Sequence, residues 1–195
     1  MPGEALVSTP EEAAEAADQI GYPVVVKLCG AAIAHKTERG LVKLGLRDGP
    51  TVQAAAAELL AAARPEDGDV ALLVAQMVSG ARELIAGFVR DDEFGPCVML
   101  GIGGIFTEAL GDVAFRLAPI DAADAADLID DLANQALLGA VRGEPPVDRA
   151  ALTRILLALA EVGEGDGRIH SIDLNPLIVA DGVPVAVDAL VELDG

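Results

Sequence analysis

Three side chains near the end of the chain have the types and the spacing of ligands for a hard metal ion. Asp173 and Asn175 lie two residues apart in the apolar run Ile172–Val179, and Asp188 ends a second run that starts at Pro184. Strand residues two apart share a face, and an Asp-Gly pair between the runs favours a tight turn, so we expect a β-hairpin with Asp188 on the partner strand. Carboxylate and amide oxygens suit Mg²⁺, which takes one or two protein ligands and leaves the rest to water and phosphate. The alternative is that these groups only cap strands and bond turns, and Asp-x-Asn spacing alone does not decide.

A lysine and a histidine in the first part of the chain are of types that handle phosphate. Lys27 ends the short apolar run that starts at Val24, and His35 lies in a His-Lys-Thr loop that closes at Gly40. A lysine on a rigid strand supplies a point charge for phosphate, and an imidazole held beside a nucleotide accepts a phosphoryl group. The alternatives are a strand-end lysine with its ammonium group in water and an ordinary surface histidine.

Groups that suit the base and the ribose of a nucleotide occur in the middle of the chain. The strand expected from Val70 ends at Gln76, Met77 and Val78, and Glu83 follows in the next strand. Amide and backbone groups at this strand end can bond the edge of a base, and a carboxylate can accept hydrogen bonds from ribose hydroxyls. The alternative is plain sheet packing and a hairpin turn. The glycines at 101–104 lack the later glycine of a dinucleotide fingerprint, and the chain has no Gly-x-Ser-x-Gly motif of a serine hydrolase.

The periodicity of apolar residues places these groups on an α+β (mixed α/β) scaffold. We expect one helix that starts within Ser8–Glu12 and ends near Ile20, and further helices over 51–63, 121–138 and 148–162. We expect strands over 24–27, 41–46, 70–77, 82–89 and 95–100, followed by the closing hairpin. Strands in the middle with flanking helices indicate two lobes with a cleft, the first over about 1–78 and the second over 79–195.

Composition restricts the partners. The 195 residues carry a net charge of −19, which repels nucleic acids and anionic membranes, so we expect neither as a partner. The same charge repels nucleotides, so a phosphate site requires local positive charge or a metal. Cys29 and Cys97 lack metal-ligand spacing and fit a reducing compartment, and no apolar run has the length of a membrane span. We therefore expect a soluble cytoplasmic protein, and the abrupt start suggests a piece of a longer polypeptide.

A series of short motifs in a fixed order resembles the ATP-grasp domain of the ADP-forming acyl-CoA synthetases, the acetate–CoA ligase type related to the succinyl-CoA synthetase β subunit. The motifs extend over nearly the whole chain. They are Gly21–Lys27, His35–Glu38, Gln76–Leu84, Phe94–Glu108, Asp112–Pro119, Arg142–Asp148, Ile172–Leu177 and Val187–Ala189.

The resemblance implies an ATP-grasp fold in which two α+β lobes hold ATP between them. It implies that the phosphate lysine is Lys27, that the adenine hinge is Gln76, Met77 and Val78, and that the acid on the ribose side is Glu83. The Mg²⁺ ligands it implies are Asn175 and Asp188, with Asp173 close by.

The resemblance also implies a reaction. An acyl-CoA gives an acyl phosphate, then a phosphohistidine, and finally ATP from ADP, and the sequence of steps runs in both directions. His35 corresponds to the histidine associated with phosphoryl relay in the His-Lys-Thr loop. CoA is expected to be bound by ligase α-type domains or a partner subunit that this chain does not contain.

Two differences from the family pattern lie beside that loop. Gly30-Ala31-Ala32 stands where the family usually has Ser-Pro-Asp, and Leu41 stands where a second glycine usually follows Gly40. Both favour an alternative function, a non-catalytic nucleotide-sensing or docking domain associated with an acyltransferase or a CoA-binding partner. The phosphate and metal groups that are present favour phosphoryl transfer instead.

Overall fold

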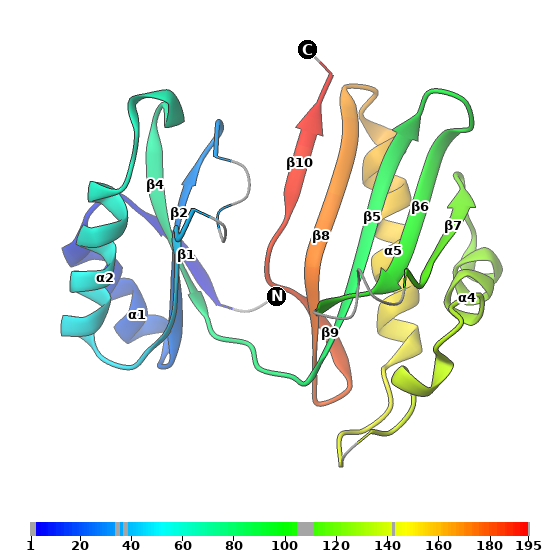
Figure 1. Ribbon diagram of the computed structural model, residues 1–195, viewed down its shortest axis with the longest axis horizontal. Helices are drawn as coiled ribbons and strands as arrows, with labels where there is room; N and C mark the ends of the chain where they lie inside the picture. Colours follow the sequence, from blue (N-terminus) through cyan, green and yellow to red (C-terminus); the bar gives the residue numbers. More distant parts are fainter. Residues whose placement is uncertain (1–2, 34–35, 37–38, 105–110, 142, 195) are drawn as a thin grey trace. The chain divides into compact units, whose positions relative to one another are not determined.

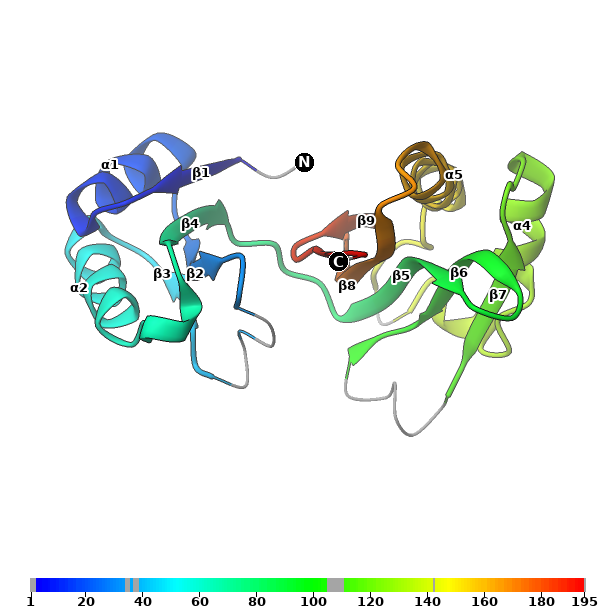
Figure 2. The ribbon, with the colours of Figure 1, turned by 90° about the horizontal axis from the view of Figure 1, so that it is seen from above.

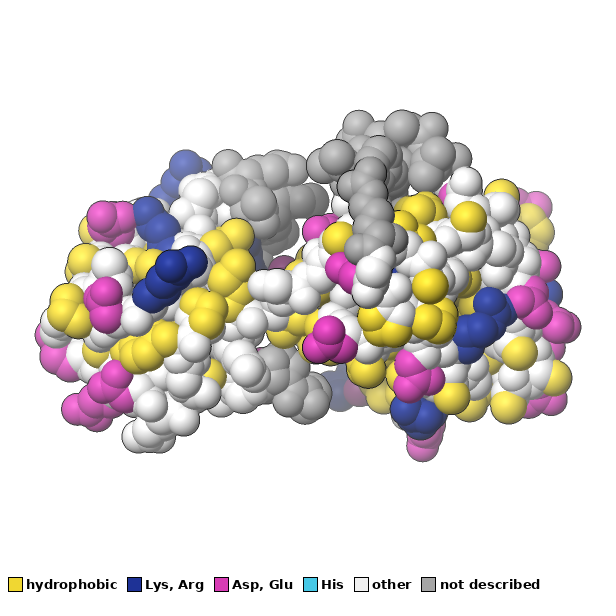
Figure 3. Space-filling view, turned by 90° about the horizontal axis from the view of Figure 1, so that it is seen from below, with side chains coloured by type: hydrophobic (Ala, Val, Ile, Leu, Met, Phe, Trp, Pro, Cys, Tyr) yellow, Lys and Arg dark blue, Asp and Glu magenta, His cyan; other side chains and the backbone are white. Residues whose placement is uncertain are grey.

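The computed structural model describes residues 3–33, 36, 39–104, 111–141 and 143–194. The chain forms two compact units, Met1–Met77 and Val78–Gly195 (Figure 1). Asp and Glu side chains occur over both units on the face drawn in Figure 3, as the charge of the sequence leads one to expect. No helix within the described ranges is long and apolar enough to cross a membrane.

The first unit is a four-stranded antiparallel sheet with two helices on one face (Figure 2). The sheet order is β1-β4-β2-β3, and the core lies between the sheet and the helices. The elements are β1 (Glu4–Val7), α1 (Pro10–Ile20), β2 (Val24–Gly30), β3 (Val42–Leu46), α2 (Gly49–Ala61), a 3₁₀ turn η1 (Pro65–Asp67) and β4 (Val70–Gln76).

Helix α1 begins where the sequence predicts. The Thr9 side chain accepts a hydrogen bond from the Glu12 amide at 3.2 Å, and the Glu12 carboxylate accepts from the Thr9 and Ser8 amides. This reciprocal cap satisfies N–H groups that have no partner inside the helix. The helix ends at Ile20 because Gly21 adopts a positive φ of 91°.

The second unit is a six-stranded antiparallel sheet of order β10-β8-β5-β6-β7, and β9 also pairs with β8. Helices α4 and α5 lie on one side of this sheet (Figure 2), and its core is formed by the strand residues that face them. The elements are β5 (Arg82–Asp91), β6 (Gly95–Ile102), β7 (Val113–Leu117), α4 (Ala122–Asp130), a 3₁₀ turn η3 (Gln135–Leu137), α5 (Arg149–Gly165), β8 (Ile169–Ala180), β9 (Val183–Ala186) and β10 (Leu190–Leu193).

The helix predicted over 121–138 was wrong in its length, because α4 already ends at Asp130. The Gln135 side-chain amide donates to the carbonyls of Ile129 and Leu132 at 2.7 and 2.9 Å, which satisfies oxygens at the helix end. The buried Asp112 carboxylate accepts hydrogen bonds from residues that follow the helix. The local bonds of Gln135 and the long-range bonds of Asp112 together stop the helix although the apolar periodicity continues.

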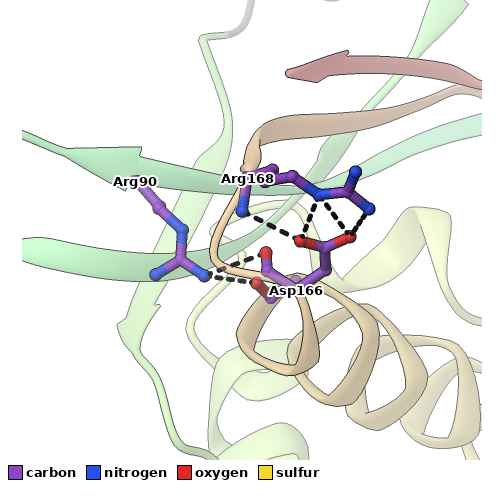
Figure 4. A network of polar contacts seen from close by, with 4 residues as sticks. Arg90, Asp166 and Arg168 are labelled. Carbon is purple, nitrogen blue, oxygen red and sulfur yellow. Dashed lines mark hydrogen bonds and ion pairs between the residues drawn. The ribbon is translucent and has the colours of Figure 1, made fainter. Parts of the chain in front are cut away.

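Arg90 on β5 fixes the C-terminal end of α5 (Figure 4). Its Nε donates to the Ile169 carbonyl at 2.9 Å and its Nη2 donates to the Gly163 carbonyl at 2.6 Å, so the helix end is bonded to the sheet. In the same turn Arg168 pairs with Asp166, and this guanidinium holds the pKa of the Asp166 carboxyl at about 2.

The α+β class predicted from the sequence is confirmed, whereas β7 and β10 were not predicted.

Candidate nucleotide and metal site

The predicted hairpin at the end of the chain is confirmed. Strand β8 pairs antiparallel with β9, with Leu177 opposite Ala186. The two strands are joined by Asp181 and Gly182, whose φ angles are 48° and 84°. Positive φ at both central residues is the geometry of the two-residue turn that twists with its strands.

A β-bulge in β8 contains Asn175, one of the predicted oxygen ligands, and lies two residues after another, Asp173. Against β5, Leu84 lies opposite Leu177 and Ala86 opposite Leu174, so three residue steps on β8 match two on β5. Leu174 and Leu177 therefore both pack toward the core although they are three apart. Asp173 and Asn175 are exposed on the opposite face. A bulge locally disrupts the ladder and redirects side chains, and such features are common beside functional sites.

Asp188 does not lie on the partner strand, contrary to the prediction. Strand β9 ends at Ala186, and Asp188 follows in the connection to β10. The Val187 amide donates to the Pro176 carbonyl at 3.3 Å, which keeps this connection beside the bulge. Asp188 therefore lies in the connection between β9 and β10, two strands that pair with different parts of β8.

The electrostatics of this corner fit a site for a cation. Desolvation raises the pKa of Asp173, and the nearby Asp188 and Glu192 carboxylates act in the same direction, while a hydrogen bond with Asn175 opposes them. Asp173 is exposed, so its desolvation is partial and the facing negative charges matter. Across the described part of the chain no three His, Cys, Asp or Glu side chains converge as a metal cage. The corner thus offers a few oxygen ligands rather than a complete protein cage, which is the donor set typical of Mg²⁺ with phosphate.

Lys27 lies inside a strand rather than at its end, because β2 continues to Gly30. It is opposite Leu73 on β4 and Val42 on β3, and the residue is only 7% exposed. Its neighbours Val26 and Leu28 belong to the core beneath the helices, so Lys27 points to the other face of the sheet. This burial does not match the alternative of a strand-end lysine whose ammonium group is in water.

The base of the loop that follows β2 is fixed at both ends. Ile33 and Leu41 are buried in the core of the first unit at 3% and 1% exposure, and the Leu41 carbonyl accepts from the Leu28 amide at 3.0 Å. Arg39 makes a bidentate ion pair with the buried Asp67 at 2.7 and 2.9 Å. Leu41, one of the two differences from the family pattern, is therefore a core residue. His35 lies outside the described residues.

The predicted adenine hinge is held by its backbone. The Gln76 amide donates to the Gly3 carbonyl at 2.9 Å and the Met77 amide donates to the Pro23 carbonyl at 3.0 Å. These two N–H groups already have partners, so at Gln76 the exposed side chain is the group that can bond a base edge. Val78 is the first residue of the second unit.

Glu83 lies beside the glycine-rich segment, a contact that sequence analysis did not anticipate. Its carbonyl accepts from the Gly103 amide at 2.8 Å, and a Cβ added at Gly104 would lie 3.4 Å from the Glu83 carboxylate. Glu83, Gly103 and Gly104 line a pocket of about 290 Å³ in the second unit, together with Arg82 and Leu137. The glycines are thus explained by close approach to the strand that carries Glu83.

Comparison with known proteins places this architecture in a family. An ATP-grasp domain model matches residues 1–193. The β subunit of acetate–CoA ligase [ADP-forming] I of Pyrococcus furiosus is 38% identical over 182 residues, which are 92% of this chain and 78% of that protein. The 4-hydroxybutyrate–CoA ligase [ADP-forming] of Nitrosopumilus maritimus is 36% identical over 93% of this chain, but the match spans only 26% of that longer protein.

Solved structures agree with the sequence comparison. Acetyl-coenzyme A synthetase 1 of Ca. Korarchaeum cryptofilum, in complex with coenzyme A, Ca-AMPCP and HgCl⁺, gives a TM-score of 0.91 at 34% identity over the whole chain and 86% of that chain. A second structure of this enzyme, with coenzyme A and Mg-AMPPCP and its phosphohistidine segment pointing towards the nucleotide binding site, gives 0.82 at 35% identity over 99% of this chain and 85% of that one.

The chain belongs to the ATP-grasp domain family. Within that family it corresponds to the ATP-grasp portion of the ADP-forming acyl-CoA ligases. The family resemblance and the ATP-grasp fold predicted from the sequence are confirmed.

Proposed function

We propose that this chain binds ATP or ADP with Mg²⁺ and transfers a phosphoryl group between the nucleotide and a histidine. In the complete ligase this step belongs to the reaction acyl-CoA + ADP + Pi = carboxylate + CoA + ATP. The observation that carries the proposal is the exposed pair of Asp173 and Asn175 at the bulge of β8, next to Asp188, in a chain of this family. The structure of a relative with Mg-AMPPCP and a phosphohistidine segment supports it.

Asn175 and Asp188 would hold the magnesium ion, with Asp173 beside them. The facing carboxylates of Asp173, Asp188 and Glu192 favour a divalent cation, and the few protein oxygens leave coordination positions for phosphate. When bound, the ion neutralises charge that develops on the phosphate oxygens. Because the whole chain carries a net charge of −19, this local positive charge is what allows an anionic ligand to bind.

The chain's own residues bind and orient the nucleotide. Lys27, on the sheet face away from the helices, supplies a fixed positive charge to the phosphates. Gln76 and the carbonyls of the hinge over Met77 and Val78 bond the base edge, and the Glu83 carboxylate accepts hydrogen bonds from the ribose hydroxyls. A nucleotide held at these points places its terminal phosphate in a defined position.

His35 accepts the phosphoryl group. In the ATP-consuming direction its unprotonated ring nitrogen forms the new N–P bond while the bond from the γ-phosphorus to the bridging oxygen breaks, and ADP leaves with that oxygen. In the opposite direction ADP takes the group back. Transfer of the group between the phosphohistidine and an acyl phosphate requires CoA-binding domains, which we propose are supplied by a ligase α-type subunit or a fused segment. One relative is a β subunit, and another is a longer protein of which the match spans 26%.

The test is labelling with ATP that carries ³²P in the γ position. The wild-type chain should acquire acid-labile, base-stable label, and the His35→Ala variant should not. The chain has only two histidines, so His170→Ala is a matched control that should retain the label. Label that persists in His35→Ala would remove His35 from the relay.

A second candidate function is nucleotide sensing or docking without transfer. It is favoured by Gly30-Ala31-Ala32, because these residues supply no hydroxyl or carboxylate beside the phosphates. Exchange of label between ADP and ATP, with a CoA-binding partner supplied, separates the two functions. A sensor would bind both nucleotides and show no exchange.

A further inference from the structure

Arg82 is an almost fully buried guanidinium in a cluster of acceptors at the start of β5. It is 7% exposed. Its Nε donates to Glu144 at 3.2 Å, its Nη1 to the carbonyls of Leu137 and Gly139 at 3.2 and 2.7 Å, and its Nη2 to the carbonyl of Pro145 at 2.5 Å. Guanidinium groups fit several acceptors at once, so this side chain holds Leu137, Gly139 and Pro145 against the first residue of the strand.

Glu144 completes the arrangement from the loop side. One carboxylate oxygen accepts from Arg82, and the other accepts from the backbone amide of Ala81 at 3.1 Å. The backbone of Glu144 is itself held by two hydrogen bonds with Val141, at 2.9 and 3.2 Å. The Arg82–Glu144 pair therefore sets the direction of the chain over the residues that immediately precede Glu83.

Glu83 is held on its other side by the glycine-rich segment. The Gly103 amide bonds its carbonyl at 2.8 Å, and Gly104 lies against its carboxylate. In a strand, the side chain of residue 83 points away from that of residue 82, so fixing Arg82 on the core face fixes Glu83 on the opposite face. The two residues line the same pocket of about 290 Å³ at the start of the strand.

We propose that Arg82 and Glu144 are positioning residues that aim the Glu83 carboxylate at the ribose hydroxyls and thereby set the preference for ribonucleotides over 2′-deoxyribonucleotides. The inference rests on the ribose role proposed for Glu83. Its ligand class is a ribonucleoside diphosphate or triphosphate. A site that accepts a hydrogen bond from a hydroxyl binds the analogue without that hydroxyl more weakly. This preference exists only if the acceptor is held in the right position.

The experiment is calorimetric titration of the full chain with Mg·ADP and with Mg·2′-deoxy-ADP. The wild-type chain should prefer ADP by about tenfold, the ratio that corresponds to one hydrogen bond to a charged group. Glu83→Gln should reduce this preference to about threefold or less. Glu144→Gln should reduce the preference to the same extent, because it weakens the hydrogen bonds of residue 144 with Ala81 and Arg82. It should lower the affinity for ADP and leave the affinity for 2′-deoxy-ADP within about twofold of wild type.

Two further variants distinguish the positioning role from a general effect of charge. Glu164→Gln removes one negative charge from an exposed position of α5, and it should leave the ratio unchanged. Arg82→Lys keeps the charge but not the planar fork, and it should lower the ratio as Glu144→Gln does. Because Arg82 is buried, Glu144→Gln, at a residue that is 30% exposed, is the decisive variant, and its melting temperature verifies the fold.

The outcomes separate the inference from the proposed function. Suppose that Glu83→Gln removes the preference for ADP, whereas the folded Glu144→Gln variant keeps it or loses affinity equally for both nucleotides. The positioning role is then overturned and the ribose role of Glu83 stands. If the wild-type chain binds both nucleotides equally and Glu83→Gln changes nothing, the ribose role of Glu83 is overturned and the inference falls with it.

Discussion

Gly182, in the turn of the hairpin formed by β8 and β9, provides a quantitative test of how that hairpin is built. Its φ is 84°, and an added Cβ would lie 2.6 Å from the Pro146 carbonyl oxygen, a backbone atom that has little freedom to move. The Gly182 carbonyl also accepts from the Asp148 amide at 2.7 Å. The hairpin and the 145–148 loop are therefore in direct contact, and Gly182→Ala should disturb both.

Gly95 is a matched control in the same unit. Its φ is also 84°, but a Cβ added there meets no described atom within 4 Å. A left-handed conformation costs a residue with a Cβ about 1–2 kcal/mol, which both variants share. Gly182→Ala should lose about 1 kcal/mol more, the value of one hydrogen bond, because the loop must move away. We expect destabilisation of about 2–3 kcal/mol for Gly182→Ala and about 1–2 kcal/mol for Gly95→Ala.

The assay is urea unfolding followed by far-ultraviolet circular dichroism and by tyrosine fluorescence. The chain has one tyrosine, Tyr22, and no tryptophan, so the fluorescence reports on the first unit alone. Circular dichroism reports on both units, and the transition of the second should shift to lower urea. Equal losses of free energy in the two glycine variants would refute the contact between Gly182 and the 145–148 loop.

Three further changes follow from the packing and the charges. In Gly163→Ala the new Cβ would lie 2.4 Å from Cγ of the buried Phe88, so overpacking should outweigh the gain in helix propensity and cost about 1–2 kcal/mol in urea unfolding; a more stable variant would contradict that contact. Asp112→Asn places an amide where a carboxylate now accepts three N–H donors, and it should cost about 2–3 kcal/mol; an unchanged midpoint of urea unfolding would contradict this bonding. The hydrogen-bonded Arg39 guanidinium, together with a backbone amide, lowers the pKa of Asp67 to about 2, so its contribution to stability is present above the ordinary pKa near 3.8 and is lost as the pH falls towards 2. In Asp67→Asn, the free energy of unfolding measured against pH should not show this decrease. Parallel curves for variant and wild type would contradict the contribution of the Asp67 carboxylate.

Local sequence signals predicted the closing hairpin because its turn is made by adjacent residues. Asp181 and Gly182 are of the types that accept positive φ, and they lie between two apolar runs. The bulge at residues 175–176 was not predictable in this way, since it exists only in register with β5. For the same reason Asp188 was placed on β9, although the strand ends two residues earlier.

The Arg82 cluster shows a signal that was available in the sequence. Arg82 alternates with Leu84 and therefore belongs to the core face, where a charge requires buried partners. The sequence did not show that these partners are the carbonyls of a loop more than 50 residues away. The length of α4 was misjudged partly for a similar reason, because one of the groups that end it, the Asp112 carboxylate, comes from a distant segment.

The measurement that most directly tests the central claim is calorimetric titration of the full chain with ATP, with and without Mg²⁺. The account predicts that the wild-type chain binds ATP more tightly with Mg²⁺, and that the double variant Asn175→Ala/Asp188→Ala loses this dependence on magnesium. A double variant that binds Mg·ATP as tightly as the wild type would contradict the assignment of the metal to the bulged strand and the connection beside it.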